Sequence, residues 1–135
     1  MKTNLLPSIA LLVALHFSGE ISAFGEGLDS MPPVVVRTVP EAGTNDVPSG
    51  EFVIKVTFSK PMAHGSWSWS DAWRGSAPQI VEQPHYEAAG KTCAMKVMLE
   101  PGHTYGWWLN SQKFQGFRDV GNRPAVPYLL TFQTK

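Results

Sequence analysis

Short runs in which apolar and polar residues alternate constrain this sequence more than any other feature. The clearest run covers residues 51–58, where every second side chain from Phe52 to Phe58 is large and apolar, with Lys55 and Thr57 between them. Successive side chains of a β-strand point to opposite faces of its sheet. The alternation therefore predicts a strand with one buried face.

Similar runs recur along the chain and are separated by clusters of proline, glycine, serine and asparagine, which favour turns. The predicted strands are residues 33–39, 51–58, 66–70, 79–86, 92–99, 104–109 and 128–134. Proline at the start of the first strand and Pro84 within the fourth predict that both lie at sheet edges, because proline cannot donate to a strand ladder. Short strands at this spacing predict an all-β fold, a single antiparallel β-sandwich.

The first residues have the pattern of a secretory signal. Lys2 precedes an apolar stretch from Leu5 to Phe17, which is shorter than the roughly 20 residues that span a bilayer. Small residues up to Ala23 offer a cleavage site. We therefore expect residues 1–23 to be a signal peptide, 24–31 a short linker and 32–135 the sandwich domain. The mature protein is then secreted or periplasmic and has no membrane span.

Charge and cysteine content narrow the possible partners and compartments. The 11 basic and 11 acidic residues give a formal net charge of +0, so no electrostatic attraction to nucleic acid is expected. Cys93 is the single cysteine, which excludes an internal disulfide. It alternates in step with Met95 and Val97, so we interpret it as a buried apolar residue rather than a nucleophile or an intermolecular bridge.

Five short motifs follow one another in order. They are Pro32-Pro33, Pro40-Glu41-Ala42-Gly43, Phe58-Ser59-Lys60-Pro61-Met62, Leu99-Glu100-Pro101-Gly102-His103-Thr104-Tyr105, and Asp119-Val120-Gly121-Asn122 ahead of Phe132-Gln133-Thr134. Their order resembles the bacterial Ig-like domain family of S-layer and other cell-surface proteins. The resemblance implies an Ig-like sandwich of about seven strands, used as a spacer, adhesive or accessory module with no chemistry of its own. Tyr105 also resembles the tyrosine-corner position of such sandwiches.

A tryptophan-rich segment departs from this pattern and supplies the candidate binding residues. Trp67, Trp69 and Trp73, with Trp108 as a possible addition, could form an exposed aromatic platform that stacks on sugar rings. Burial of a large apolar side chain is worth roughly 1.5–3 kcal/mol, which favours core or core-edge positions for Trp67 and Trp69. Trp73 lies in a polar loop, where either environment fits. Trp107 and Trp108 are adjacent, so one faces inward and the other outward.

Metal and catalytic sites have little support. His64, His85 and His103 lack ligand spacing, and exported copper-resistance sandwiches rely on an N-terminal histidine where the predicted mature chain begins with Phe24. Residues 119–122 could offer oxygens to calcium, but we expect a turn in which the Asp119 carboxylate bonds nearby amides. The sequence has no Gly-x-Ser-x-Gly or His-Glu-x-x-His motif. We expect no catalytic residue, no metal and no cofactor.

Together these patterns predict an exported, non-catalytic Ig-like module that makes protein contacts at the cell surface or in the envelope. A small carbohydrate-binding module that uses the tryptophans is the first alternative, and a periplasmic copper carrier is the second. The partner, protein or glycan, stays unidentified from the sequence.

Overall fold

The computed structural model describes residues 27–135 and shows an all-β fold. Its elements are η1 (Leu28–Ser30), β1 (Val35–Val39), β2 (Gly50–Phe58), β3 (Trp69–Asp71), β4 (Gln79–Tyr86), β5 (Thr92–Leu99), β6 (Thr104–Leu109) and β7 (Tyr128–Gln133). The predicted signal peptide lies outside the described residues. Within residues 27–135, no helix is long and apolar enough to cross a bilayer.

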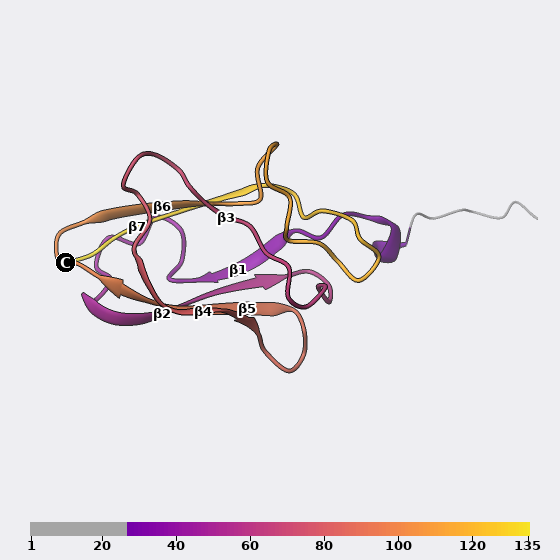
Figure 1. Cartoon of the computed structure of the whole chain (residues 1–135), viewed down its shortest axis with the longest axis horizontal. Helices are drawn as coiled ribbons and strands as arrows, with labels where there is room; N and C mark the ends of the chain where they lie inside the picture. The colour runs from indigo at the N-terminus through magenta and orange to yellow at the C-terminus, as the bar shows by residue number, and fades with distance from the viewer. Residues whose placement is uncertain (1–26) are drawn as a thin grey trace, which may run out of the picture.

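The strands form two antiparallel sheets that pack as a sandwich. One sheet has the order β1-β2-β5-β4 and the other β3-β6-β7. Figure 1 shows β6 and β7 in one layer and β2, β4 and β5 in the other. This is the strand order of a constant-type Ig sandwich, in which the first, second, fifth and fourth strands face the third, sixth and seventh. The predicted fold class is confirmed.

The core lies between the sheets and follows the alternation in the sequence. Each central strand contributes every second side chain, and those side chains are almost fully buried. They include Ile54, Val56 and Phe58 from β2, Cys93, Met95, Val97 and Leu99 from β5, Tyr105, Trp107 and Leu109 from β6, and Leu130 and Phe132 from β7. The interpretation of Cys93 as a buried apolar residue is confirmed. Burial on this scale stabilises the sandwich, since each such side chain contributes roughly 1.5–3 kcal/mol.

The edge positions of β1 and β4 agree with the prediction, whereas the start of β3 does not. β1 and β4 lie at the two edges of the larger sheet, as their prolines indicate. β3 begins at Trp69 rather than at the predicted Ser66. The hydroxyl of Ser66 donates to the carbonyl of Gly116, and that of Ser68 accepts from the Gly116 N–H. Side-chain bonds to the loop after β6 thus take the place of a regular strand, and Trp67 lies outside β3.

Two sets of hydrogen bonds close the end of the sandwich where β5 turns into β6. The Tyr105 hydroxyl accepts from the backbone N–H of Glu100 at 2.8 Å, which confirms the tyrosine corner. The Thr134 hydroxyl accepts from the backbone N–H of His103 at 2.9 Å and donates to the carbonyl of Glu100. We call Glu100, Tyr105 and Thr134 the corner end.

The outer edge of β7 is covered by the segment between β1 and β2. Val47 pairs in parallel with Thr134, and the backbone N–H of Gly43 donates to the carbonyl of Thr131. Residues 43–47 therefore extend the smaller sheet on the side away from β3.

Candidate functional site

Trp69 is placed by β3 with its ring against the core. It lies opposite Leu109, and its ring meets Trp107 and Phe117 edge-on, at centroid distances of 5.0 Å and 5.5 Å. Edge-to-face packing of this kind is a favoured geometry for aromatic pairs. Trp67 is half-buried and packs against the same cluster. Both tryptophans therefore lie at the edge of the core, the position that burial energy favours.

The Trp69 indole N–H is buried and meets no conventional hydrogen-bond acceptor among the described residues. The Cys93 thiol, on the opposite sheet, lies within reach of this N–H. Burial raises the pKa of the Cys93 thiol to about 12 and outweighs the contact with the Trp69 indole, which acts in the opposite direction. Cys93 is therefore a neutral thiol at ordinary pH and does not form the thiolate, which is the nucleophilic species.

Trp73 is held by a tight loop that follows β3. The buried Ser76 hydroxyl accepts from the backbone N–H groups of Ala72 and Trp73 and donates to the carbonyl of Gly106 at 2.7 Å. A Cβ at position 106 would lie 2.4 Å from the benzo end of the Trp73 ring. Gly106 thus makes room for the indole, which stays 45% exposed.

Trp108 lies on the outer face of β6, two residues from Gly106 and on the same side. It is half-buried beside a hollow of about 490 Å³ whose other walls are Ser111, Gln112, Lys113 and Pro127. Trp107, its neighbour, is buried, so the predicted division into one inward and one outward side chain is confirmed.

The structure thus does not bring the four candidate tryptophans together. Trp73 and Trp108 share the outer face of the smaller sheet, whereas Trp67 and Trp69 belong to its inner side. A single platform made from all four rings is excluded by this arrangement.

Trp67 and Trp69 do line a cleft, which we call the seam groove. It is an open cleft of about 500 Å³ between the free edges of β3 and β4, and its walls include Trp67, Trp69, Asp71, Ile80, Pro84 and Phe114. Ile80 and Phe114 are 44% and 51% exposed. Sequence reasoning missed both residues. Phe114 lies in a polar loop, and only its isolation there could have marked it.

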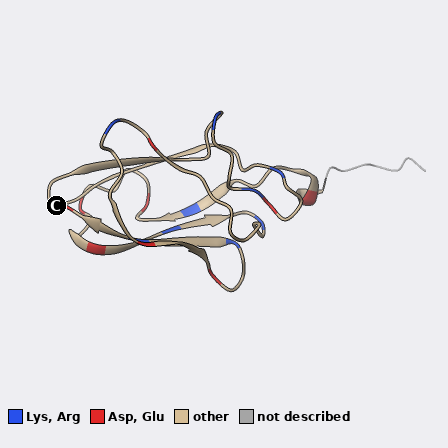
Figure 2. Ribbon diagram, viewed as in Figure 1, with Lys and Arg blue, Asp and Glu red and all other residues tan. Residues whose placement is uncertain are grey.

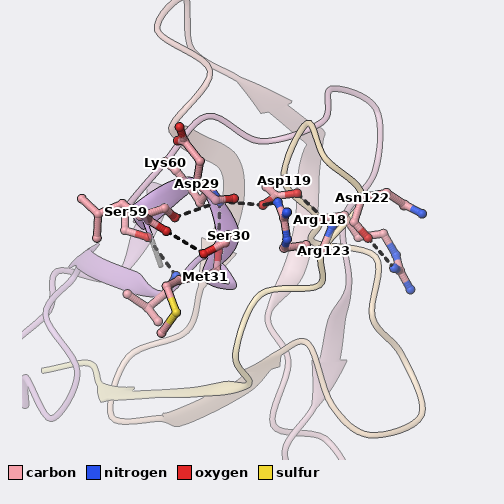
Figure 3. Close-up of polar contacts among 12 residues, drawn as sticks. Asp29, Ser30, Met31, Ser59, Lys60, Arg118, Asp119, Asn122 and Arg123 are labelled. Atoms are coloured by element: carbon pink, nitrogen blue, oxygen red, sulfur yellow. Dashed lines mark hydrogen bonds and ion pairs between the residues drawn. The ribbon is translucent and has the colours of Figure 1, made fainter. Parts of the chain in front are cut away.

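A second polar cluster closes the end of the sandwich opposite the corner end. The buried carboxylate of Asp119 lies 2.8 Å from Nζ of Lys60 and 3.6 Å from the guanidinium of Arg123 (Figure 3). Asp119 Oδ2 has no well-directed hydrogen bond, so its contact with the Lys60 ammonium is an electrostatic ion pair. Oδ1 accepts from the backbone N–H of Arg123 at 2.8 Å. We call Lys60, Asp119 and Arg123 the charged end.

Lys60 also ties the N-terminal turn to this cluster. Its ammonium donates to the carbonyls of Leu28, Asp29 and Met31 at 3.3, 3.0 and 2.9 Å. Burial opposes ionisation of Asp119, but the Lys60 ammonium and the Arg123 backbone N–H and guanidinium outweigh it and hold the pKa of the carboxyl below its ordinary value. The predicted turn, with the Asp119 carboxylate bonded to a nearby amide, is confirmed, and the cation that neutralises it is a lysine.

The histidines are dispersed. His64 stacks on Tyr86 at 5.4 Å, and His103 packs against Tyr105 at 4.4 Å beyond the other end of β5. Residues 27–135 contain no group of three metal-ligating side chains of the kind a metal site needs. Acidic and basic residues are interspersed over the larger sheet and the loops, whereas β6 and β7 carry none (Figure 2). The copper-carrier alternative gains no support from this arrangement.

Comparison with known proteins supplies a family and a fold. The profile of the family described as "Bacterial Ig-like domain" matches residues 29–134. A solved structure titled "Structure of surface layer protein SbsC, domains 1-6" is similar, with a TM-score of 0.50 and 17% identity. The match covers 77% of this chain and 14% of that one, so the present chain spans a small part of that protein. No curated protein sequence matches the chain.

Proposed function

The chain belongs to the bacterial Ig-like domain family, and from this premise we propose that it is an exported, non-catalytic module that makes protein contacts at the cell surface or in the envelope. The observation that carries the proposal is the family match over nearly the whole sandwich. A fold shared with a surface-layer protein fits a role as a cell-surface module.

The buried polar side chains support a structural rather than a catalytic role. Asn110 donates to the carbonyls of Phe117 and Ala125 and accepts from the Phe117 N–H, and Ser76 and Thr134 are bonded to backbone in the same way. Side chains committed to backbone partners hold loops in place and are not poised to act on a substrate.

Export is tested by expressing the full chain in a bacterial host and sequencing the N-terminus of the product. We propose residues 1–23 as the signal, 24–31 as the linker and 32–135 as the domain. The expected product lies outside the cytoplasm and begins at Phe24. A cytoplasmic product that retains residues 1–23 would overturn the export claim.

Contact function is tested with the purified mature protein and isolated cell envelopes of the source organism. We expect saturable binding that disappears when the envelopes are treated with protease and persists after glycosidase treatment. Absence of saturable binding would contradict the proposed function.

A carbohydrate-binding module is the second candidate, and one observation favours it. Trp73 is half-exposed on the outer face of the smaller sheet, with Trp108 two positions along β6 from the glycine that Trp73 covers. Aromatic faces presented in this way suit sugar rings. Tryptophan fluorescence titrations against a glycan panel, repeated with Trp73→Ala and Trp108→Ala, test it. Binding that both substitutions abolish would support this candidate over the first.

A further inference from the structure

The edge of β3 that borders the seam groove carries unpaired main-chain groups. The backbone N–H of Asn110 donates to the carbonyl of Ser68, and that of Ala72 donates to the carbonyl of Gly106. These bonds flank the pairs Trp69↔Leu109 and Asp71↔Trp107, which are therefore the non-hydrogen-bonded pairs of the ladder. The N–H and C=O groups of Trp69 and Asp71 point away from β6, and no hydrogen-bond partner meets them among the described residues.

The inner face of β4 lies uncovered beside this edge. Ile80 pairs with Val97, whose side chain is in the core, so Ile80 points toward the opposite sheet. It is nevertheless 44% exposed, because the smaller sheet ends at β3. Variable-type Ig sandwiches carry additional strands at this same edge. The seam groove is thus the position of a strand that this sandwich lacks within residues 27–135.

The other three sheet edges are protected. β1 is flanked by Pro33 and Pro40 and has a register shift, and β4 contains Pro84 and two register shifts. The outer edge of β7 is paired with residues 43–47. Prolines, bulges and covering segments are the usual devices that keep sheet edges from pairing with other chains. Within residues 27–135, the β3 edge has none of these three and is guarded by its short length and by the charge of Asp71, which a partner strand must accommodate.

We propose that an extended segment of a partner protein, with apolar side chains at alternate positions, adds to β3 as a strand in the seam groove. The inference rests on the proposed function, since it names the partner class and the surface for protein contacts. Main-chain bonds to Trp69 and Asp71 would hold the segment, and its inward side chains would cover Ile80 and contact Pro84 and Phe114. Asp71 is the one charged residue among those that line the groove, which favours a neutral or basic segment.

The test uses the mature protein as bait for a displayed library of eight-residue peptides. The proposal expects enriched peptides with apolar residues at every second position. Binding should slow hydrogen exchange of the Trp69 and Asp71 amides, and main-chain N-methylation of a selected peptide should abolish its binding. Failure to enrich any peptide, or binding that survives N-methylation, overturns strand addition.

Two substitutions with matched controls locate the binding. With an uncharged selected peptide, Asp71→Pro removes an N–H that points into the groove, whereas Asp71→Ala keeps it; we expect a loss of about tenfold in affinity for the first only. Ile80→Lys places a charge in the groove, whereas Val81→Lys alters the neighbouring residue, which is 41% exposed and does not line the groove. Equal effects within either pair overturn the proposal, and unchanged denaturation midpoints confirm that the variants are folded.

The envelope-binding measurement separates the two claims. If Ile80→Lys abolishes peptide binding and envelope binding together, the groove is the contact surface. If envelope binding persists in Ile80→Lys, the module still makes contacts but the groove assignment is wrong. Competition by soluble glycans rather than by the selected peptides would overturn the protein-strand proposal in favour of a sugar ligand.

Discussion

At the corner end of the sandwich, neutral groups tie the loops together: the Tyr105 hydroxyl meets a backbone N–H, and the Thr134 hydroxyl bridges two backbone groups. At the charged end, a buried carboxylate, an ammonium and a guanidinium do the same for the loop that follows β6. Both ends close one sandwich, yet they respond differently to pH and to loss of one partner. Removing one partner at the corner end costs a single neutral hydrogen bond. Removing one partner at the charged end leaves a buried charge without its counter-charge.

The largest expected effect is that of Lys60→Met. It leaves the buried Asp119 carboxylate with the Arg123 guanidinium at 3.6 Å as its remaining charged partner, and it removes the donor to three backbone carbonyls. We expect a loss of roughly 3 kcal/mol or more in the free energy of unfolding, measured by urea denaturation. The exposed Lys91→Met serves as the control and should change it by less than about 0.5 kcal/mol. Similar losses in both variants would show that Lys60 contributes no more to stability than an exposed lysine.

Asp119→Asn should have a smaller effect that depends on pH. Lys60 keeps its three carbonyl acceptors, so we expect a loss of about 2 kcal/mol at neutral pH. Because the folded-state pKa of Asp119 is depressed, its stabilisation is complete above the ordinary carboxyl pKa of about 4 and is lost as pH falls through the lower folded value. Denaturation from pH 7 down to about pH 2.5 should therefore show the two proteins converging. A constant difference would contradict the ion-pair account.

Tyr105→Phe should cost about 1 kcal/mol, because one hydrogen bond to the Glu100 N–H is lost while the buried ring remains. The loss should be the same from about pH 3 to pH 8, since no charge is involved. Tyr128→Phe, whose hydroxyl has no hydrogen bond among the described residues, is the matched control and should be close to neutral. A pH-dependent loss would remove the contrast between the two ends.

The smallest expected effect is that of Arg123→Ala. Its side chain is 44% exposed and lies 3.6 Å from the carboxylate, while its backbone N–H donates to Oδ1 in either variant. Partly exposed pairs of this kind contribute about 0–1 kcal/mol and weaken with salt. Denaturation at low and high ionic strength should show a difference from the parent that shrinks with salt. A large, salt-independent loss would mean that Arg123, not Lys60, neutralises Asp119.

The central strands could be predicted because one face of each is buried, so that the alternation from Phe52 to Phe58 carries both position and orientation. The start of β3 could not be predicted, because the hydroxyls of Ser66 and Ser68 bond to the backbone of the distant Gly116 in place of strand pairing. The pairing of Lys60 with Asp119 was equally hidden. Each lies in a recognisable motif, but their contact depends on how two loops meet.

The candidate site shows the same division. That Trp67 and Trp69 both pack against the core could be predicted from burial energy, whereas the position of Trp73 on the opposite face depends on the Ser76 loop and on Gly106. The seam groove could not be foreseen, because it arises from where one sheet ends relative to the other. Such a property belongs to the strand order and not to any segment of sequence.

The parallel pairing of residues 43–47 with β7 has a mechanical consequence. The chain runs from the charged end through β1 into residues 43–47, and it leaves β7 at the corner end (Figure 1). Tension applied between these two ends of the sandwich therefore pulls the paired segments along their length. The hydrogen bonds between them are then loaded together in shear rather than broken one after another. In the proposed role at the cell surface, that arrangement would resist stretching where a hairpin of the same size would unzip.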